Sequence, residues 1–248
     1  MKRLLCLVAL LSVAAMPALA APPHRVSPAN FASDFQTLPA VANVTGAGGA
    51  VFQTYVSILN PTPAAFPVAV SLFDANGTRR DATINLAAGE LKTFDNFLAE
   101  VFNFTGAGAA TFAAPTPADR FILNAEVWTS GTRFTTTLPV VEFPGSTSPA
   151  YAAGVTVSSA KRTNVGCFNQ SGVASTVRAT VFDRSGAITL GSQNLSLAAN
   201  GWSQTGVATT VSDGYIKFEP SEPAICYAVV VDNVTNDGSV IAAVEYAP

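Results

Sequence analysis

Few residues in this chain have the types and spacing that catalysis or metal binding requires. His24 is the only histidine, and it follows closely on a stretch that we expect to be removed. A nucleophilic site needs a histidine fixed in a packed cleft, so His24 is a poor candidate. Zinc needs three or four histidine, cysteine or acidic ligands, and Cys167 and Cys226 are already candidates for pairing. We therefore expect no catalytic residues, no metal and no cofactor.

Carboxylates are the next candidates, because two of them suffice for glycoside hydrolysis. Glu126, Glu142, Glu219 and Glu245 fall in segments with a strand-like pattern. A catalytic pair needs two environments that separate the pKa values of its members, whereas Glu142 and Glu245 occupy matching positions of the repeat described below. Such single acids are typical of solvent-facing strand positions, and hydrolysis is the last of our alternatives.

Calcium ligands could come from three short segments, residues 74–77 (DANG), 183–186 (DRSG) and 232–233 (DN). None has the acidic density of a dedicated calcium loop. Aspartate caps the local backbone and glycine adopts angles that other residues avoid. The segments at 74–77 and 183–186 therefore predict hairpin turns.

Aromatic side chains are the remaining route to ligand recognition. Trp and Tyr stack on sugars when exposed, and they also fill the cores of β-sandwiches. We expect core or rim packing first, with Trp128, Trp202 and Tyr215 as the candidates for ligand contact. The wider set of aromatics that could take part is Trp128, Phe134, Tyr151, Trp202 and Tyr215. Asn-x-Ser/Thr sequences, a weak sign of glycosylation in a chain rich in these residues, occur at Asn43, Asn76, Asn103, Asn169, Asn194 and Asn233.

A repeat in the sequence indicates which elements would position these residues. Residues 53–60 read QTYVSILN and residues 162–169 read RTNVGCFN, 109 positions apart, and FDANG at 73–77 returns as FDRSG at 182–186 with the same offset. A constant offset over this distance predicts two copies of one folding unit.

Short apolar runs separated by Gly, Asn, Asp and Pro are typical of a β-sandwich. Between residues 90 and 104, Phe94, Leu98 and Val101 recur at helical spacing, which predicts a short helix between Asp95 and Asn103. The corresponding stretch of the second copy, residues 201–213, is polar, and we expect a loop there.

Cys167 and Cys226 are the cysteines left once Cys6 is removed with the leader. An even number of cysteines in an exported chain predicts a disulfide. The first copy has Ile58 and Leu123 at the aligned positions. We therefore expect the cysteines to face each other across the sandwich.

The first twenty residues are typical of a secretion signal, with a basic start at Lys2 and Arg3, an apolar run and an Ala-Leu-Ala site before Ala21. Its removal takes the basic count from 13 to 11 against 16 acidic residues. The resulting net charge near −5 argues against a nucleic-acid partner. No later apolar run is long enough to span a bilayer. We expect a secreted or periplasmic protein without membrane insertion.

The repeated blocks resemble a type of exported bacterial repeat protein with immunoglobulin-like β-sandwich modules. Its modules carry an Arg-Thr-x-apolar-x-apolar-x-Asn strand, an apolar-Asp-x-x-Gly turn, a Leu-x-Leu segment and a closing Asp-Asn strand. Here these are residues 162–169, 182–186, 195–201 and 231–233. The first copy departs from the pattern, with Gln53 in place of the arginine and Thr129 in place of the aspartate. The resemblance implies a fold and no active site.

The sequence therefore predicts an all-β chain of two tandem immunoglobulin-like β-sandwich domains, with one short helix in the first. We expect a signal peptide at 1–20, a loose segment at 21–30, domains at 31–145 and 151–248, and a linker at 146–150. The favoured function is a non-catalytic exported binding or structural module with an unknown protein or glycan partner. Carbohydrate binding through exposed aromatics is the alternative, followed by glycoside hydrolysis.

Overall fold

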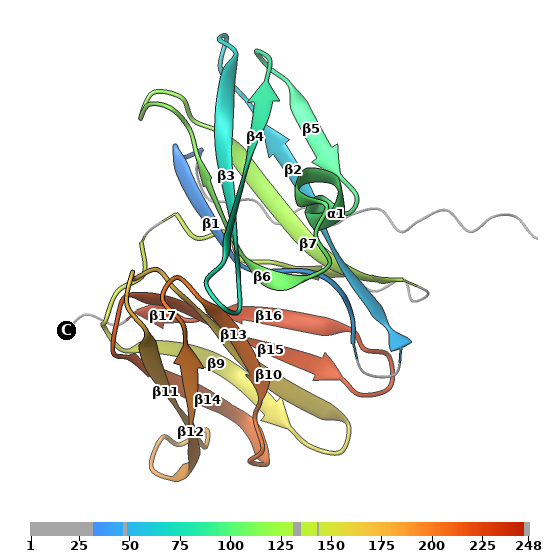
Figure 1. The fold of residues 1–248 in the computed structure, drawn as a ribbon. Helices are drawn as coiled ribbons and strands as arrows, with labels where there is room; N and C mark the ends of the chain where they lie inside the picture. The colour runs from blue at the N-terminus through green and yellow to red at the C-terminus, as the bar shows by residue number, and fades with distance from the viewer. Residues whose placement is uncertain (1–31, 47–48, 131–134, 143, 246–248) are drawn as a thin grey trace, which may run out of the picture.

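The computed structural model describes residues 32–46, 49–130, 135–142 and 144–245. The expected signal peptide, the segment at 21–30, His24 and Phe134 lie outside these residues. Strands connected by turns make up nearly all of the described chain (Figure 1), so the all-β prediction is confirmed. The division into domains at 31–145 and 151–248 stays a prediction.

The strands fall into two groups, which we call the first half (residues up to 142) and the second half (residues 144–245). The first half contains β1 (Phe35–Thr45), β2 (Val51–Leu59), β3 (Phe66–Asp74), β4 (Arg79–Leu86), β5 (Leu91–Phe94), α1 (Phe97–Phe102), β6 (Gly106–Ala113), β7 (Ile122–Ser130) and β8 (Thr135–Thr137). The second half contains β9 (Ala150–Val157), β10 (Lys161–Asn169), β11 (Ser175–Phe182), β12 (Thr189–Leu197), β13 (Trp202–Gly206), β14 (Val211–Pro220), β15 (Ala224–Asp232), β16 (Gly238–Ala242) and β17 (Val244–Glu245).

The first half forms one sheet with the order β4-β3-β6-β1-β2-β7-β8, with β5 added at β2. β1 and β2 pair only between residues 43–45 and 51–53, so the strands on either side of this hairpin form two layers. One hydrophobic core lies between the layers, and it includes Leu38, Ile58, Leu72 and Phe112, all fully buried. This arrangement is a sandwich closed at one corner.

The second half consists of two separate sheets, ordered β13-β10-β15-β16 and β12-β11-β14-β9-β17. Alternate side chains of each sheet point into a second core, which includes Val165, Val181, Ile216 and Phe218. Because side chains alternate across a strand, the four-stranded sheet also presents a second face, away from this core. That face lies against the first half (Figure 1).

The strand pairings of the two halves correspond. β2 pairs with β5 and β7, as β10 pairs with β13 and β15. β3 pairs with β4 and β6, as β11 pairs with β12 and β14. The halves differ at the β1–β2 pairing and at the helix, which follows β5 and has no counterpart after β13.

The predicted short helix is confirmed as α1. The Asn96 side chain accepts a hydrogen bond from the Ala99 amide and Glu100 accepts one from the Asn96 amide, so the first turn is capped from both directions. Asn103 ends the helix in the left-handed conformation. Phe97 and Leu98 are fully buried and hold the helix on the first core.

The loop predicted for residues 201–213 is wrong in part. Trp202–Gly206 is strand β13, whose five residues pair with residues 164–168 of β10, and strand β14 begins at Val211. Ser203, Gln204 and Thr205 lack the apolar alternation of a strand, but β13 is an edge strand, and backbone hydrogen bonds to β10 do not require apolar side chains. Polar residues therefore do not distinguish an edge strand from a loop here.

Cys167 and Cys226 form the predicted disulfide, with 4.1 Å between their Cα atoms. Their expected position across the sandwich is wrong, because they are directly opposed on the neighbouring strands β10 and β15. Both side chains point into the second core. Ile58 and Leu123, their counterparts in the first half, are likewise opposed on β2 and β7.

Two buried asparagines at the ends of β2 and β10 make the same set of bonds. Asn60 donates to the carbonyls of Ala64 and Ala87 and accepts from the Thr62 amide. In the second half, Asn169 donates to the carbonyls of Val173 and Ala198 and accepts from the Ser171 amide. Each asparagine thus ties two loops of its half together, and neither is exposed to solvent.

The two Asp-x-x-Gly segments are hairpin turns, as predicted. Gly77 and Gly186 have φ angles of +76° and +72°, which non-glycine residues rarely adopt. Asp74 accepts hydrogen bonds from the amides of Asn76 and Thr78. Burial acts to raise the pKa of Asp74, but these bonds and the Arg80 side chain outweigh it and lower the pKa below its ordinary value of 3.8.

Candidate binding site between the two halves

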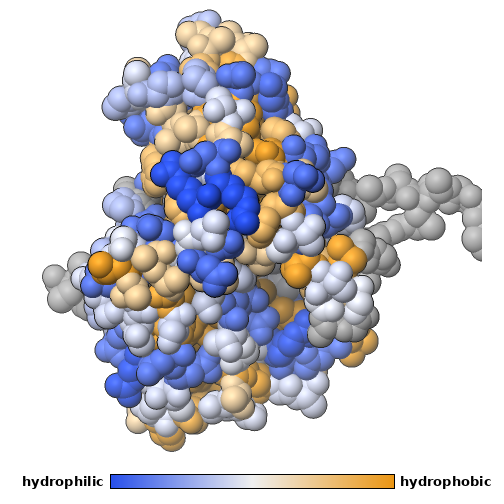
Figure 2. All heavy atoms as spheres, in the orientation of Figure 1, coloured by the Kyte–Doolittle hydropathy of each residue, from blue (hydrophilic) through white to orange (hydrophobic). Residues whose placement is uncertain are grey.

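A cavity of about 440 Å³ lies where the second face of the four-stranded sheet meets the first half. The space-filling view shows a recess at this junction (Figure 2). Close contacts surround the cavity: the Phe73 and Phe168 rings lie 5.3 Å apart, and Thr136 donates to the Gly238 carbonyl. The two halves therefore touch at several points and leave a space between them.

The first half supplies a largely apolar wall. Ala40, Val41 and Ala42 are consecutive residues of β1 that all line the cavity. Strict alternation would turn every second side chain away, but the pairing of β1 with β6 shifts register between Leu38 and Val41. Pro39 lies in this interval and has no N–H to donate to the ladder, which accounts for the irregularity.

The second half supplies the polar side chains of the cavity. Arg162 and Asn164 alternate along β10 and lie opposite Val231 and Val229 of β15. Their neighbours Thr163 and Val165 are buried on the other face of the sheet. Gln204 and Trp202 reach the cavity from β13, and Asn236 reaches it from the turn after β15.

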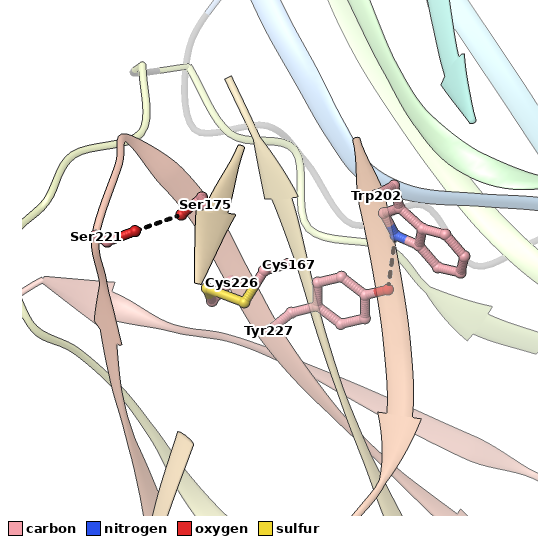
Figure 3. Close-up of a disulfide and its surroundings, with 6 residues drawn as sticks. All are labelled: Cys167, Ser175, Trp202, Ser221, Cys226 and Tyr227. Atoms are coloured by element: carbon pink, nitrogen blue, oxygen red, sulfur yellow. Dashed lines mark hydrogen bonds between the residues drawn. A yellow bond between two sulfur atoms is a disulfide. The ribbon is translucent and has the colours of Figure 1, made fainter. Parts of the chain in front are cut away.

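A chain of hydrogen bonds runs from Trp202 through Tyr227 to Gln204 beside the cavity. The Trp202 indole N–H donates to the Tyr227 hydroxyl at 3.1 Å (Figure 3). That hydroxyl donates to Gln204 Oε1 at 2.9 Å. Tyr227 is fully buried, and burial raises the pKa of its phenol. Tyr227 therefore stays protonated and fixes both Trp202 and Gln204.

Gly166 makes the position of Tyr227 possible. A Cβ atom at Gly166 would overlap the hydroxyl and ring of Tyr227, because Tyr227 crosses β10 to reach β13. The first half has Ser57 at the corresponding position. The aromatic chain is therefore particular to the second half.

Arg162 is anchored by two amide oxygens. Its guanidinium donates to Asn233 Oδ1 and Asn236 Oδ1, both at 3.0 Å. Arginine has five N–H donors, so three remain for other acceptors. None of the ion pairs found among the described residues involves Arg162.

The structure separates the three aromatics that are the candidates for ligand contact. All three side chains are half-buried, so their burial alone does not distinguish stacking on a ligand from packing in the core. Trp202 lines the cavity. Trp128 lies on β7 and donates its indole N–H to the Asp95 carbonyl. Tyr215 lies on β14 of the five-stranded sheet, on the face opposite the core residue Ile216.

Tyr215 is part of an aromatic row across the five-stranded sheet. Its ring is nearly parallel to that of Phe182, 9° apart with centroids 4.8 Å apart, and it is tilted against Tyr151 at 6.3 Å. Sugars stack on the faces of aromatic rings, and Phe182 covers one face of Tyr215. The row therefore does not form a flat platform of ring faces.

The four candidate carboxylates do not gather at the cavity. Glu126 is buried on β7, opposite Tyr55 of β2. Glu219 accepts a hydrogen bond from Lys217 at 2.6 Å, and Glu245 is exposed on β17. Within the described residues, no three His, Cys, Asp or Glu side chains are placed to hold a metal ion.

Sequence reasoning missed the cavity and the role of Arg162. The sequence indicates Arg162 only as the first residue of a structural strand motif. Its alternation with Val165 and Cys167 already placed it on the opposite face of β10 from the cysteine. The sequence does not indicate that this face of β10 packs against the first half of the chain.

Comparisons with known proteins give no family. No protein-family model matches the chain, and no curated protein matches it. A crystal structure of a glycosyl hydrolase family 2 member from Bacteroides cellulosilyticus DSM 14838 is similar over 82% of this chain, with 10% identity and a TM-score of 0.18. The match spans 27% of that protein's chain. A TM-score this low carries no argument about fold or function.

Proposed function

We propose that this protein is a non-catalytic, exported binding module whose ligand occupies the cavity between its two halves. The observation that carries the proposal is the cavity itself. Its volume of about 440 Å³ falls in the range of about 300–1,000 Å³ that is typical of small-molecule sites. Such sites are mostly apolar with a few placed polar groups, and they occur preferentially where two units meet.

Export is supported by the disulfide and by the amino-terminal sequence. Disulfides persist in oxidising compartments outside the cytoplasm, and Cys167–Cys226 lies within a β-sheet. No helix of the described residues is long and apolar enough to cross a membrane. Mass spectrometry of the protein purified from its native host should give a mature chain that begins at Ala21. A chain that retains residues 1–20 would contradict export by the predicted signal.

Duplication of one folding unit belongs to the same proposal. It is supported by the corresponding strand pairings and by the matching bonds of Asn60 and Asn169. The halves differ at matching strand positions, because Arg162, which lines the cavity, and Gly166 stand where the first half has Gln53 and Ser57. We infer that the two copies keep a common frame and that the second carries the polar part of the site.

A titration with N-phenyl-naphthylamine, an uncharged apolar fluorophore, tests the binding function. We expect saturable binding to the mature protein at one site. Val229 lines the cavity, so Val229→Phe should narrow it and weaken binding by at least about tenfold, because the larger ring takes space that the fluorophore needs. Val173→Phe is the matched control, because Val173 is 55% exposed and lies outside the cavity. The absence of saturable binding, or equal loss in both variants, would contradict the proposal.

A glycan is the second candidate ligand, and one observation favours it. Trp202 lines the cavity beside Asn164 and Gln204, and a tryptophan ring with neighbouring amides can hold a sugar. A glycan array with the mature protein should then give binding that Trp202→Ala abolishes and Trp128→Ala leaves unchanged. Binding that depends on Trp128 instead would place any sugar site elsewhere.

A further inference from the structure

We infer that the cavity takes a single-chain amphiphile, an alkyl chain with one anionic head, and that Arg162 binds the head. The inference rests on the proposed binding function and names its ligand class. It follows from three features of the cavity: the sign of its charge, the distribution of its polar groups and the chemistry of its walls.

The charge of the cavity is positive and comes from one side chain. Arg162 is the charged residue among those that line the cavity, and none of the lining residues in the described chain is acidic. An anion entering the cavity would therefore meet a cation and no like charge. A cationic head would meet Arg162 without a carboxylate to balance it, which is unfavourable in a partly buried site.

Arg162 is held ready for an anion. Asn233 and Asn236 accept two of its hydrogen bonds and leave the guanidinium charge without a counter-ion among the described residues. Asn233 is fixed in turn by its bond to the Ser159 carbonyl. Because the guanidinium is already oriented, binding an anion costs little side-chain entropy, and charge-assisted bonds to it are among the stronger hydrogen bonds in proteins.

Polar groups are not spread evenly around the cavity. The arginine and amide side chains, Arg162, Asn164, Gln204 and Asn236, all come from the second half. The first half offers alanine, valine, leucine, phenylalanine and threonine side chains. A ligand that matches this arrangement has its polar end against the second half and its apolar end against the first.

The apolar walls favour an alkyl chain over a sugar. Ala40, Ala42, Val44 and Phe52 on the first half have no side-chain donor or acceptor, so hydroxyl groups against them would lose hydrogen bonds to water without replacement. An alkyl chain loses none and is stabilised by each CH₂ group that it removes from water. An alkyl chain therefore fits this wall better than a glycan does.

Titration calorimetry with three probes of equal chain length tests the inference on the mature protein. Dodecanoate and dodecylamine are used below their micelle-forming concentrations and dodecanol below its solubility limit, all at neutral pH. We expect dodecanoate to bind at least about tenfold more tightly than dodecanol, and dodecylamine to bind more weakly than dodecanol. This comparison needs no substitution and so does not depend on the folding of a variant.

Arg162→Gln separates binding of the head from a structural role of the arginine. The variant should lose the preference for dodecanoate and retain the affinity for dodecanol. Arg178→Gln, on the exposed outer face of β11, should change neither. Equal losses for dodecanoate and dodecanol in Arg162→Gln would show a structural role and overturn the inference.

The failure of this inference is distinguishable from that of the proposed function. If the wild-type protein binds dodecanol and dodecanoate equally, the cavity binds apolar ligands and the assigned head group is wrong. If it binds the glycans of the array and none of the three probes, the ligand class is wrong. If it binds neither the probes nor N-phenyl-naphthylamine, the binding function falls as well.

Discussion

Single residues on alternating positions of β10 have opposite roles. Val165 and Cys167 are buried in the second core, whereas Arg162 and Asn164 line the cavity. Gly166, which stands between Val165 and Cys167, leaves room for Tyr227 to reach Trp202 and Gln204. One strand thus contributes to the core and to the candidate site, and the period of two in the backbone separates the two functions.

The buried asparagine at the end of β10 gives a prediction at this scale. Asn169→Ala removes a side chain that bonds to the Val173 and Ala198 carbonyls and to the Ser171 amide. Because these backbone groups lose their partner, we expect the free energy of unfolding in guanidinium to fall by about 2–4 kcal/mol. Asn194→Ala, at an exposed position of β12, should change it by less than about 0.5 kcal/mol. Similar losses at the two sites would contradict this role.

A second prediction at the residue scale concerns pH. Hydrogen bonds from Thr78, Arg80 and Asn76 outweigh the effect of burial and lower the pKa of Asp74 in the folded protein. A lowered pKa stabilises the fold above the ordinary value of 3.8, and this contribution is lost as pH falls through the folded value. The melting temperature of the wild type should therefore drop more between neutral pH and acid than that of Asp74→Asn. Equal falls in melting temperature for the two proteins would contradict a stabilising role of the Asp74 carboxylate.

At the scale of elements, the disulfide joins the central strands β10 and β15 of the four-stranded sheet. It closes a loop with a sequence separation of 59 residues. We expect Cys167→Ala with Cys226→Ala to lower the free energy of unfolding by about 4 kcal/mol, because the cross-link limits the unfolded chain. Reductant present during unfolding should lower wild-type stability by a similar amount and leave the double variant unchanged. A variant as stable as the oxidised wild type would contradict this account.

The sequence predicted elements where the signal was local. The spacing of Phe94, Leu98 and Val101 predicted α1, and the Asp-x-x-Gly segments predicted two hairpin turns. It failed where the outcome depended on neighbours in space. A pattern of period two gives the face on which Cys167 lies, but it does not say whether Cys226 lies on the next strand or on the opposite sheet. β13 was not predicted because its residues are polar and show no strand pattern. It forms through backbone hydrogen bonds to β10, a neighbour that is distant in the sequence.

At the scale of the whole molecule, the candidate site depends on how the two halves meet. The halves have corresponding strand pairings and separate cores. The cavity borders the first core, because Val41 and Leu138 belong to that core and also line the cavity. Its apolar wall follows from the irregularity of β1 at Pro39 and its polar wall from β10 and β13. The site could not be predicted from either wall alone, because the cavity forms only where the two sheet faces meet.

Methyl NMR of the valine-labelled protein during titration with N-phenyl-naphthylamine tests the central claim most directly. Cavity valines from both halves, Val44, Val127, Val229 and Val240, should shift together with one dissociation constant. Val70 and Val181, which are buried in the two cores, should stay in place. Shifts confined to valines of one half, or to valines outside the cavity, would contradict a binding site between the halves.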